Sequence, residues 1–134
     1  MLLMGTKGGM MVRICVVEDE PNIIEAMRYL FEKEDWEVVV VSDGDKAFAT
    51  IHETRPSLVV LDYMLPNQSG LAVARQLRGD GATASLPILM LSAKGQHKDK
   101  EQAHLAGINL FMTKPFTNID LLDNVKQLLS ANQK

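Results

Sequence analysis

The stretch VRICVVEDEP, residues 12–21, sets the pattern that the rest of the chain repeats. Residues 12–17 are a short apolar run rich in β-branched side chains, which favours a buried strand. The acidic residues Glu18 and Asp19 end this run abruptly. Pro21 suits the first turn of a helix, because its missing N–H costs little there, and apolar side chains then recur at helical spacing as far as Phe31. One strand followed by one helix is therefore predicted.

The same strand–helix unit recurs along the chain. Further strands are predicted over residues 36–41, 57–61, 86–91 and 110–113. Helical patterns follow a capping turn at residues 42–45, begin at Gly70, and cover residues 97–106 and 118–132. The strands are continuous apolar runs, as expected of strands covered on both faces. The predicted fold is α/β, a flavodoxin-like doubly wound five-stranded parallel sheet in the order 2-1-3-4-5 with five helices.

Length and composition limit the classes of protein to consider. The chain has 134 residues and a mass of 14.9 kDa, which fits a single domain. We assign residues 12–132 to it and interpret residues 1–11 as a disordered leader or a cloning remnant. The single cysteine, Cys15, excludes an internal disulfide framework and a zinc site made of several thiolates.

Charge and hydropathy also exclude some partners. The net charge of −3 argues against direct, sequence-independent binding of nucleic acid, which needs a basic face. No apolar run reaches the roughly 20 residues that a membrane-spanning helix needs. We therefore expect a cytoplasmic protein that contacts neither nucleic acid nor membrane.

Polar side chains follow the predicted strands at their carboxyl ends. Glu18 and Asp19 come after the first strand, and Asp62 ends the third. Ser92 and Lys114 follow the fourth and fifth strands. In an open parallel sheet these ends line one crevice, and in the order 2-1-3-4-5 its deepest point lies between strands one and three. The three carboxylates are therefore expected to converge, with a hydroxyl and an ammonium group beside them.

Three carboxylates at one point repel one another unless a cation lies among them. Mg²⁺ is the predicted ion, with Mn²⁺ as an alternative, because Mg²⁺ takes oxygen ligands and accepts phosphate oxygens at its remaining positions. A carboxylate in such a site can attack phosphorus and form an aspartyl phosphate. We predict Asp62 as the nucleophile, Glu18 and Asp19 as metal ligands, Lys114 as the partner of the phosphoryl oxygens and Ser92 as a hydrogen-bond donor.

Each of these residues also has an ordinary interpretation. Glu18 and Asp19 suit a helix start, where the dipole favours negative charge. Asp62 suits an Asx turn, and Ser92 is a plausible strand-end hydroxyl. Their occurrence together with Lys114, at the ends of four strands, favours a functional site.

The chain resembles the receiver domains of two-component response regulators, including chemotaxis regulators, over residues 12–132. The matching segments are VVEDEP after the first strand, LDYMLPNQSG around Asp62, LSAK after the fourth strand and TKPF after the fifth. The resemblance implies that Asp62 accepts a phosphoryl group from a sensor histidine kinase or a phosphotransfer protein in a Mg²⁺-dependent reaction that the receiver itself catalyses. It also implies that the backbone carbonyl of Met64 is a metal ligand and that the peptide bond before Pro115 is cis.

The resemblance further implies a switch. Ser92 moves toward the phosphoryl group and Phe111 rotates inward, which reshapes the surface of the fourth helix, fifth strand and fifth helix, where a homodimer could also form. Phe111 stands where tyrosine is common, and Asn109-Leu110 stand where acidic residues are common.

Two further positions bear on how long the phosphoryl group persists. Met64 and Lys94 each lie two residues beyond a site residue, on the rim that a hydrolytic water must cross. Neither is a general base at neutral pH, so slow self-dephosphorylation is expected.

Three other functions fit these residues less well. A haloacid-dehalogenase-like phosphohydrolase needs a carboxylate where Met64 stands and a cap domain. An FMN-binding flavodoxin needs a phosphate loop rich in Gly, Ser and Thr after the first strand, where this chain has acidic residues. A pseudo-receiver that only binds proteins would not need the complete set of Asp62, Asp19, Ser92 and Lys114. The favoured interpretation is a signalling module and not a turnover enzyme.

Overall fold

A five-stranded parallel sheet forms the centre of the protein in the computed structural model, which describes residues 6–7, 10–93 and 97–131. The strand order is β4-β3-β5-β6-β7. Counted along the sequence within this sheet, the order is 2-1-3-4-5, as predicted. The strands are β3 (Arg13–Val17), β4 (Glu37–Val41), β5 (Leu58–Asp62), β6 (Ile88–Ser92) and β7 (Leu110–Thr113).

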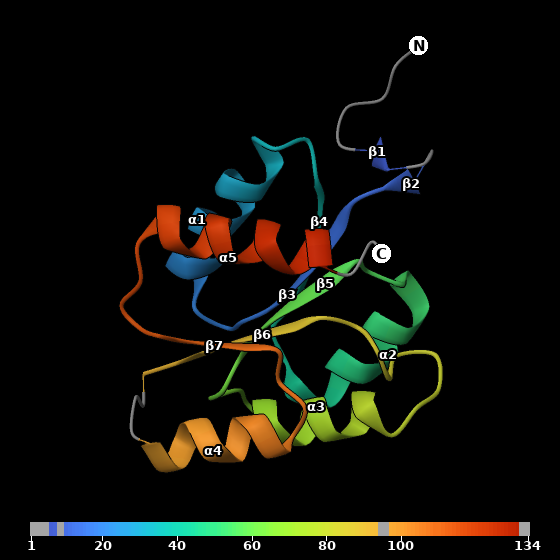
Figure 1. Cartoon of the computed structure of the whole chain (residues 1–134), viewed down its shortest axis with the longest axis vertical. Helices are drawn as coiled ribbons and strands as arrows, with labels where there is room; N and C mark the ends of the chain where they lie inside the picture. Colours follow the sequence, from blue (N-terminus) through green and yellow to red (C-terminus); the bar gives the residue numbers. More distant parts are fainter. Residues whose placement is uncertain (1–5, 8–9, 94–96, 132–134) are drawn as a thin grey trace.

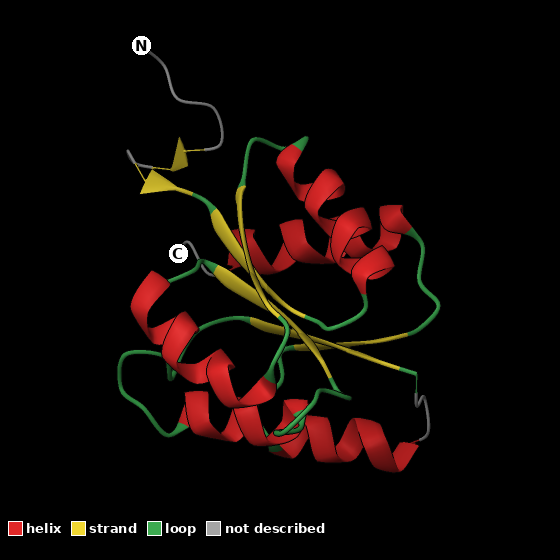
Figure 2. Cartoon of the chain, turned by 180° about the vertical axis from the view of Figure 1, so that it is seen from behind, coloured by secondary structure: helices red, strands yellow, loops and turns green. Residues whose placement is uncertain are grey.

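Helices cover both faces of the sheet (Figure 1). On one face lie α1 (Pro21–Glu32) and α5 (Asn118–Ala131). On the other lie α2 (Gly44–Thr54), α3 (Gly70–Arg78) and α4 (His97–Leu105), and the view from behind shows the same three layers (Figure 2). The class, the strand order and the five helices around the sheet are therefore as predicted.

Alternate residues of the central strands supply two separate cores. Ile14 and Leu89 pack with Phe31 on the α1 and α5 side. Cys15 and Met90 pack on the opposite side. Both β5 and β6 are buried along their whole length, which explains why their sequences are continuously apolar.

A second, two-stranded sheet lies before this domain. β1 (Thr6–Lys7) and β2 (Met10–Met11) pair in antiparallel fashion, within the stretch that was expected to be a disordered leader. Strands of two residues are too short to carry a periodic signal, so the sequence did not predict this hairpin. The start of the domain at residue 12 stays a prediction.

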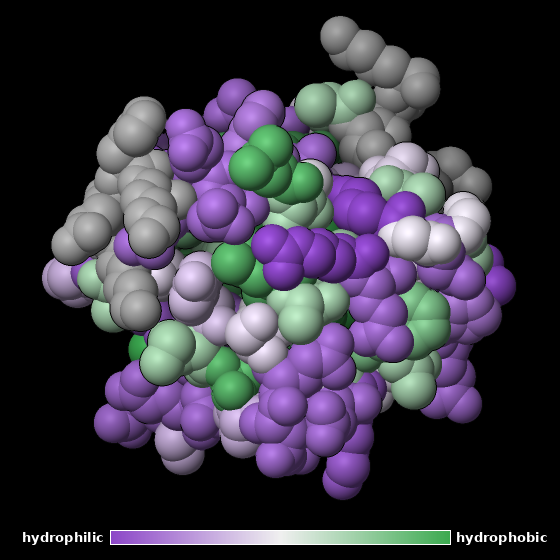
Figure 3. Space-filling view, turned by 90° about the horizontal axis from the view of Figure 1, so that it is seen from below, coloured by the Kyte–Doolittle hydropathy of each residue, from purple (hydrophilic) through white to green (hydrophobic). Residues whose placement is uncertain are grey.

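The surface is mostly hydrophilic where α3 and α4 face outward. Figure 3 shows this side of the molecule with polar groups over most of it and small, scattered apolar spots. In the described part of the chain no helix is both long enough and apolar enough to cross a membrane.

One arginine ties the end of α3 to the segments that begin β6 and β7. Arg78 Nε and Nη2 donate to the carbonyl of Gly107 at 3.0 and 2.8 Å, and Nη2 also donates to Asn109 Oδ1 at 2.9 Å. Arg78 Nη1 donates to the carbonyls of Thr83 and Ala84 at 3.3 and 3.1 Å. All five N–H groups of the guanidinium are thereby used.

Asn109 extends this contact into the sheet. Its Oδ1 accepts from the backbone N–H of Ile88 at 2.7 Å, and its own N–H donates to the Ile88 carbonyl at 3.0 Å. Asn109 stands where the resemblance leads one to expect an acid, so Arg78 is anchored here by neutral oxygens. The contact fixes the start of β7, the strand that leads to Lys114.

Replacing Arg78 with Met is expected to lower the free energy of unfolding by about 1–3 kcal/mol, because several partly buried carbonyls lose their donor. Urea unfolding followed by circular dichroism measures this change. Arg75→Met, at an exposed position of the same helix, is the matched control and should be close to neutral. Equal stability of the two variants would contradict the assigned role of Arg78.

Candidate functional site

The polar residues predicted to converge do lie at one edge of the sheet. Glu18 follows β3 directly, Asp62 is the last residue of β5, Ser92 is the last of β6, and Lys114 follows β7. Because the strands are parallel and in register, their carboxyl ends reach the same edge. Glu18, Asp19 and Asp62 each bring a carboxylate oxygen within 4.8 Å of the others.

Lys114 faces this acidic cluster, which we define as Glu18, Asp19 and Asp62. Its Nζ lies 3.2 Å from Glu18 Oε1 and 3.3 Å from Asp62 Oδ1. Burial alone lowers the pKa of Lys114, but the charges of Asp62 and Glu18 outweigh burial and raise that pKa above its usual value. Lys114 is therefore a firmly protonated cation that touches two carboxylates.

Glu18 and Asp19 are neighbours in sequence with opposite environments. Glu18 is only 1% exposed, whereas Asp19 is exposed. Burial, together with the nearby charge of Asp62, raises the pKa of Glu18 to about 7, even though Lys114 opposes this shift. Glu18 Oε2 also accepts from the backbone N–H of Glu20 at 3.2 Å. The cluster thus has a buried floor and one carboxylate open to solvent.

The cluster fits a hard divalent cation. Its donors are all carboxylate oxygens, the type that Mg²⁺ prefers. The ammonium group of Lys114 is one positive charge beside three carboxylates, and the pKa of Glu18 is raised by burial first and by the charge of Asp62 second. An added cation would favour the ionised form of all three side chains.

The start of α3 packs tightly against the end of β5, and the loop after Asp62 connects the two. A Cβ atom at Gly70 would lie 2.2 Å from the carbonyl oxygen of Asp62, so only glycine lets the first turn of α3 approach this closely. The Gly70 N–H donates to the Tyr63 carbonyl at 2.9 Å. Met64 N–H points back to Asp62 Oδ1 at 3.4 Å, and the Met64 side chain is 60% exposed.

The remaining predicted residues take the following places. Ser92 is fully buried, and its carbonyl accepts from the Lys114 N–H at 2.8 Å. Phe111 is half-buried against the core on the α2, α3 and α4 side. The Lys114–Pro115 peptide bond is cis, which confirms that expectation. Lys94 lies outside the described residues.

The sequence reasoning missed what holds the loop on its outer side. The Gly44 N–H donates to the Pro66 carbonyl at 3.0 Å, and Asn67 Nδ2 donates to Asp43 Oδ2 at 2.8 Å. Asn67 has a positive φ of 70°. No local pattern in the sequence could indicate that this loop contacts the start of α2.

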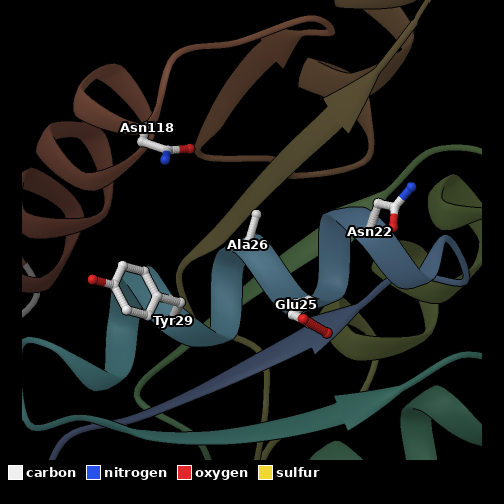
Figure 4. A pocket seen from close by; sticks show the side chains of 5 residues that line it. All are labelled: Asn22, Glu25, Ala26, Tyr29 and Asn118. Carbon is white, nitrogen blue, oxygen red and sulfur yellow. The ribbon is translucent and has the colours of Figure 1, made fainter.

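A pocket of about 460 Å³, also not predicted, lies between α1 and the start of α5. Its lining residues are Asn22, Glu25, Ala26, Tyr29 and Asn118, and Figure 4 shows four of them along α1 with Asn118 facing them from α5. None of them belongs to the acidic cluster.

Comparison with known proteins agrees with this geometry. The family model for the response regulator receiver domain matches residues 14–126. The chain is 38% identical over 120 residues to the phosphate regulon transcriptional regulatory protein PhoB of Rhizobium meliloti, covering 90% of this chain and 53% of that protein. It is 38% identical over 124 residues to the DNA-binding dual master transcriptional regulator RpaA of Synechocystis sp., covering 92% and 52%. The chain spans about half the length of these curated relatives.

Solved structures match as well. The receiver domain of a signal transduction histidine kinase from Syntrophus aciditrophicus superposes with a TM-score of 0.85 at 28% identity, covering 92% of this chain and 93% of that chain. The receiver domain of a sensor histidine kinase from Pseudomonas aeruginosa, with a magnesium ion coordinated in the active site cleft, superposes with a TM-score of 0.82 at 25% identity, covering 90% and 98%. With the sheet order and the acidic edge already described, these matches show that the chain belongs to the family of response-regulator receiver domains.

Proposed function

We propose that this receiver domain accepts a phosphoryl group on Asp62 from the phosphohistidine of a sensor histidine kinase or of a phosphotransfer protein. The observation that carries the proposal is the position of Asp62: its carboxylate lies at the buried end of β5, with Oδ1 3.3 Å from the ammonium group of Lys114. A carboxylate held beside a cation and two further acids is placed to receive a phosphoryl group and not merely to end a strand.

In the proposed reaction a carboxylate oxygen of Asp62 forms a bond to phosphorus while the bond from phosphorus to the donor's imidazole nitrogen breaks. The imidazole leaves with the electron pair and takes a proton. Lys114 then exchanges its contact with Asp62 for one with a phosphoryl oxygen, and the Ser92 hydroxyl donates to another. Because the receiver's own groups assist the step, a small phosphodonor should also serve.

We further propose that the acidic cluster holds Mg²⁺, with Mn²⁺ as an alternative. Glu18, Asp19, Asp62 and the Met64 carbonyl are the proposed protein ligands. When bound, the ion supplies positive charge beside the phosphoryl oxygens, where negative charge concentrates during transfer. Support comes from the oxygen-only donor set and from the magnesium ion in the related receiver from Pseudomonas aeruginosa.

The effect of phosphorylation is proposed to reach the surface formed by α4, β7 and α5 through Ser92 and the half-buried ring of Phe111. That surface is also the proposed site of a homodimer. The relatives PhoB and RpaA are named as transcriptional regulators and are about twice as long, so we place any DNA contact outside this domain. A cytoplasmic location, and a signalling role without enzymatic turnover of a substrate, belong to the same proposal.

Incubation with Mg²⁺ and acetyl phosphate should add one phosphoryl group to the wild-type chain, because the receiver's own residues assist the transfer. Intact-protein mass spectrometry measures the gain. Asp62→Asn should abolish the labelling, since an amide is a far weaker nucleophile than a carboxylate.

The matched control is Asp45→Asn, an exposed acid in the first turn of α2. This variant should label like the wild type. Labelling that persists in Asp62→Asn, or a wild-type chain that gains no phosphoryl group, would falsify the proposed function.

Without Mg²⁺, the stability of the wild type should fall between about pH 5 and pH 8 relative to Glu18→Gln. In the fold the pKa of Glu18 is about 7, against an ordinary value of 4.5, so in this window the folded chain holds a proton that the unfolded chain has released. Stability then declines as pH rises. The difference should be on the order of 1 kcal/mol or more, and Mg²⁺ should reduce it by favouring the carboxylate.

Urea unfolding at several pH values, with and without Mg²⁺, measures this difference. Glu20→Gln, at an exposed neighbouring position, is the control and should follow the wild type. If Glu18→Gln and the wild type keep a constant difference across the range, the buried acid does not titrate as described.

Met64→Asn should shorten the lifetime of the phosphorylated protein. Met64 is 60% exposed at the rim of the site, and replacing its apolar side chain with an amide opens a path for water and adds a group that can orient it. Decay of the phosphoryl mass at fixed pH should be about threefold faster, which corresponds to about 0.65 kcal/mol in the barrier. Met64→Leu, which keeps the apolar bulk, should decay like the wild type, and equal rates for all three proteins would refute shielding by Met64.

A further inference from the structure

The loop of residues 63–69 carries the proposed Met64 ligand, and its packing is uneven, because Tyr63 and Leu65 pack against the core on the α2, α3 and α4 side. Met64, Pro66, Asn67 and Ser69 are all exposed. The part of the loop beyond Leu65 buries little apolar surface, and such a segment has low local stability unless polar contacts hold it. The position of the loop around Met64 therefore depends on the hydrogen bonds of the exposed part as well as on the packing of Tyr63 and Leu65.

A side-chain hydrogen bond joins the loop to the start of α2. Asn67 Nδ2 donates to Asp43 Oδ2 at 2.8 Å. Asp43 uses its other oxygen, Oδ1, to cap α2 by accepting from the Asp45 N–H at 2.8 Å. One carboxylate thus joins the first turn of a helix to the tip of the loop.

Backbone contacts beside this pair show how closely the two segments meet. The Gly44 N–H donates to the Pro66 carbonyl at 3.0 Å, and a Cβ atom at Gly44 would lie 2.0 Å from the Gln68 carbonyl oxygen. Asn67 adopts the left-handed region, with φ of 70°, which asparagine tolerates better than most residues. The side chain of Asn67 is thereby turned toward α2.

We propose that Asp43 and Asn67 are positioning residues for the metal site, and we call their hydrogen bond the Asp43–Asn67 latch. The latch holds the loop against α2, so that the backbone at Met64 keeps the position from which its carbonyl can serve the cation beside Asp62. Neither residue touches the reacting atoms. This inference rests on the proposed function, because it assigns a role toward the same cation.

Two simpler roles compete with the latch. Asn67 could serve only as a turn residue with positive φ, and Asp43 only as the cap of α2. Both roles concern folding alone, so they predict effects on stability and none on the affinity for Mg²⁺. The variants below separate these roles.

Asn67→Gly keeps the positive φ and the net charge but removes the donor. Exchanging the two residues, as Asp43→Asn with Asn67→Asp, restores an amide–carboxylate pair, keeps the net charge and leaves a side-chain oxygen to cap α2. Gln68→Ala is the control, because it removes a hydrogen bond of the same loop to Gln76 that does not involve α2.

Titration of each unphosphorylated protein with MgCl₂, followed by backbone amide chemical shifts, measures metal affinity directly. Asn67→Gly should weaken Mg²⁺ binding by about fivefold, which is less than the roughly 10–100-fold effect of removing a group that directly orients a metal ligand. The exchanged pair should return to within about twofold of the wild type, and Gln68→Ala should match it.

Phosphorylation by acetyl phosphate gives the second readout. In Asn67→Gly the Mg²⁺ concentration for half-maximal labelling should rise, while labelling at saturating Mg²⁺ still reaches one phosphoryl group. Weaker Mg²⁺ binding in Asn67→Gly that the exchanged pair repairs supports the latch. Unchanged Mg²⁺ affinity in Asn67→Gly, or a loss that the exchanged pair does not repair, overturns it. Neither result resembles failure of the proposed function, which appears as a wild-type chain that takes no phosphoryl group.

Discussion

The organising constraint of this protein is the concentration of negative charge at one edge of a sheet that is otherwise apolar. Three carboxylates lie within 4.8 Å of one another, and Lys114 is in contact with two of them. Burying one partner of an ion pair is costly unless the other stays in contact. The fold satisfies this condition by ending four adjacent parallel strands, in register, around a single point.

Unequal burial gives this cluster its chemical character. Glu18 lies at its floor with a pKa raised to about 7, whereas the adjacent Asp19 is open to solvent. The negative charge is therefore only partly neutralised by the protein itself. A site in this state favours cations, and it presents the Asp62 carboxylate beside a fixed ammonium group. Phosphoryl acceptance is the chemistry that such an arrangement supports.

Two contacts outside the cluster position its elements. The guanidinium of Arg78 joins the end of α3 to the segment before β7, from which Lys114 follows. The carboxylate of Asp43 joins the start of α2 to the loop after Asp62. The first contact reaches backbone carbonyls and the Asn109 side chain, and the second joins two side chains. The Asp43 contact lies beside the acidic edge, whereas the Arg78 contact lies at the opposite edge of the sheet, where β6 and β7 begin.

Much of this architecture is encoded locally. The apolar runs placed the strands, and the polar residue after each run placed the site at their carboxyl ends, because parallel strands align those ends. One strand begins later than predicted: β6 starts at Ile88 and not at residue 86. Pro87 has no N–H to donate within the sheet, and only its carbonyl takes part, by accepting from the Val59 N–H. No residue spacing in the sequence indicated three features of the site. These are the different burial of Glu18 and Asp19, the contact of Lys114 with Glu18, and the contact of Asn67 with Asp43. They arise where separate segments meet in space, and the distances between side chains on such segments depend on how whole helices and loops pack.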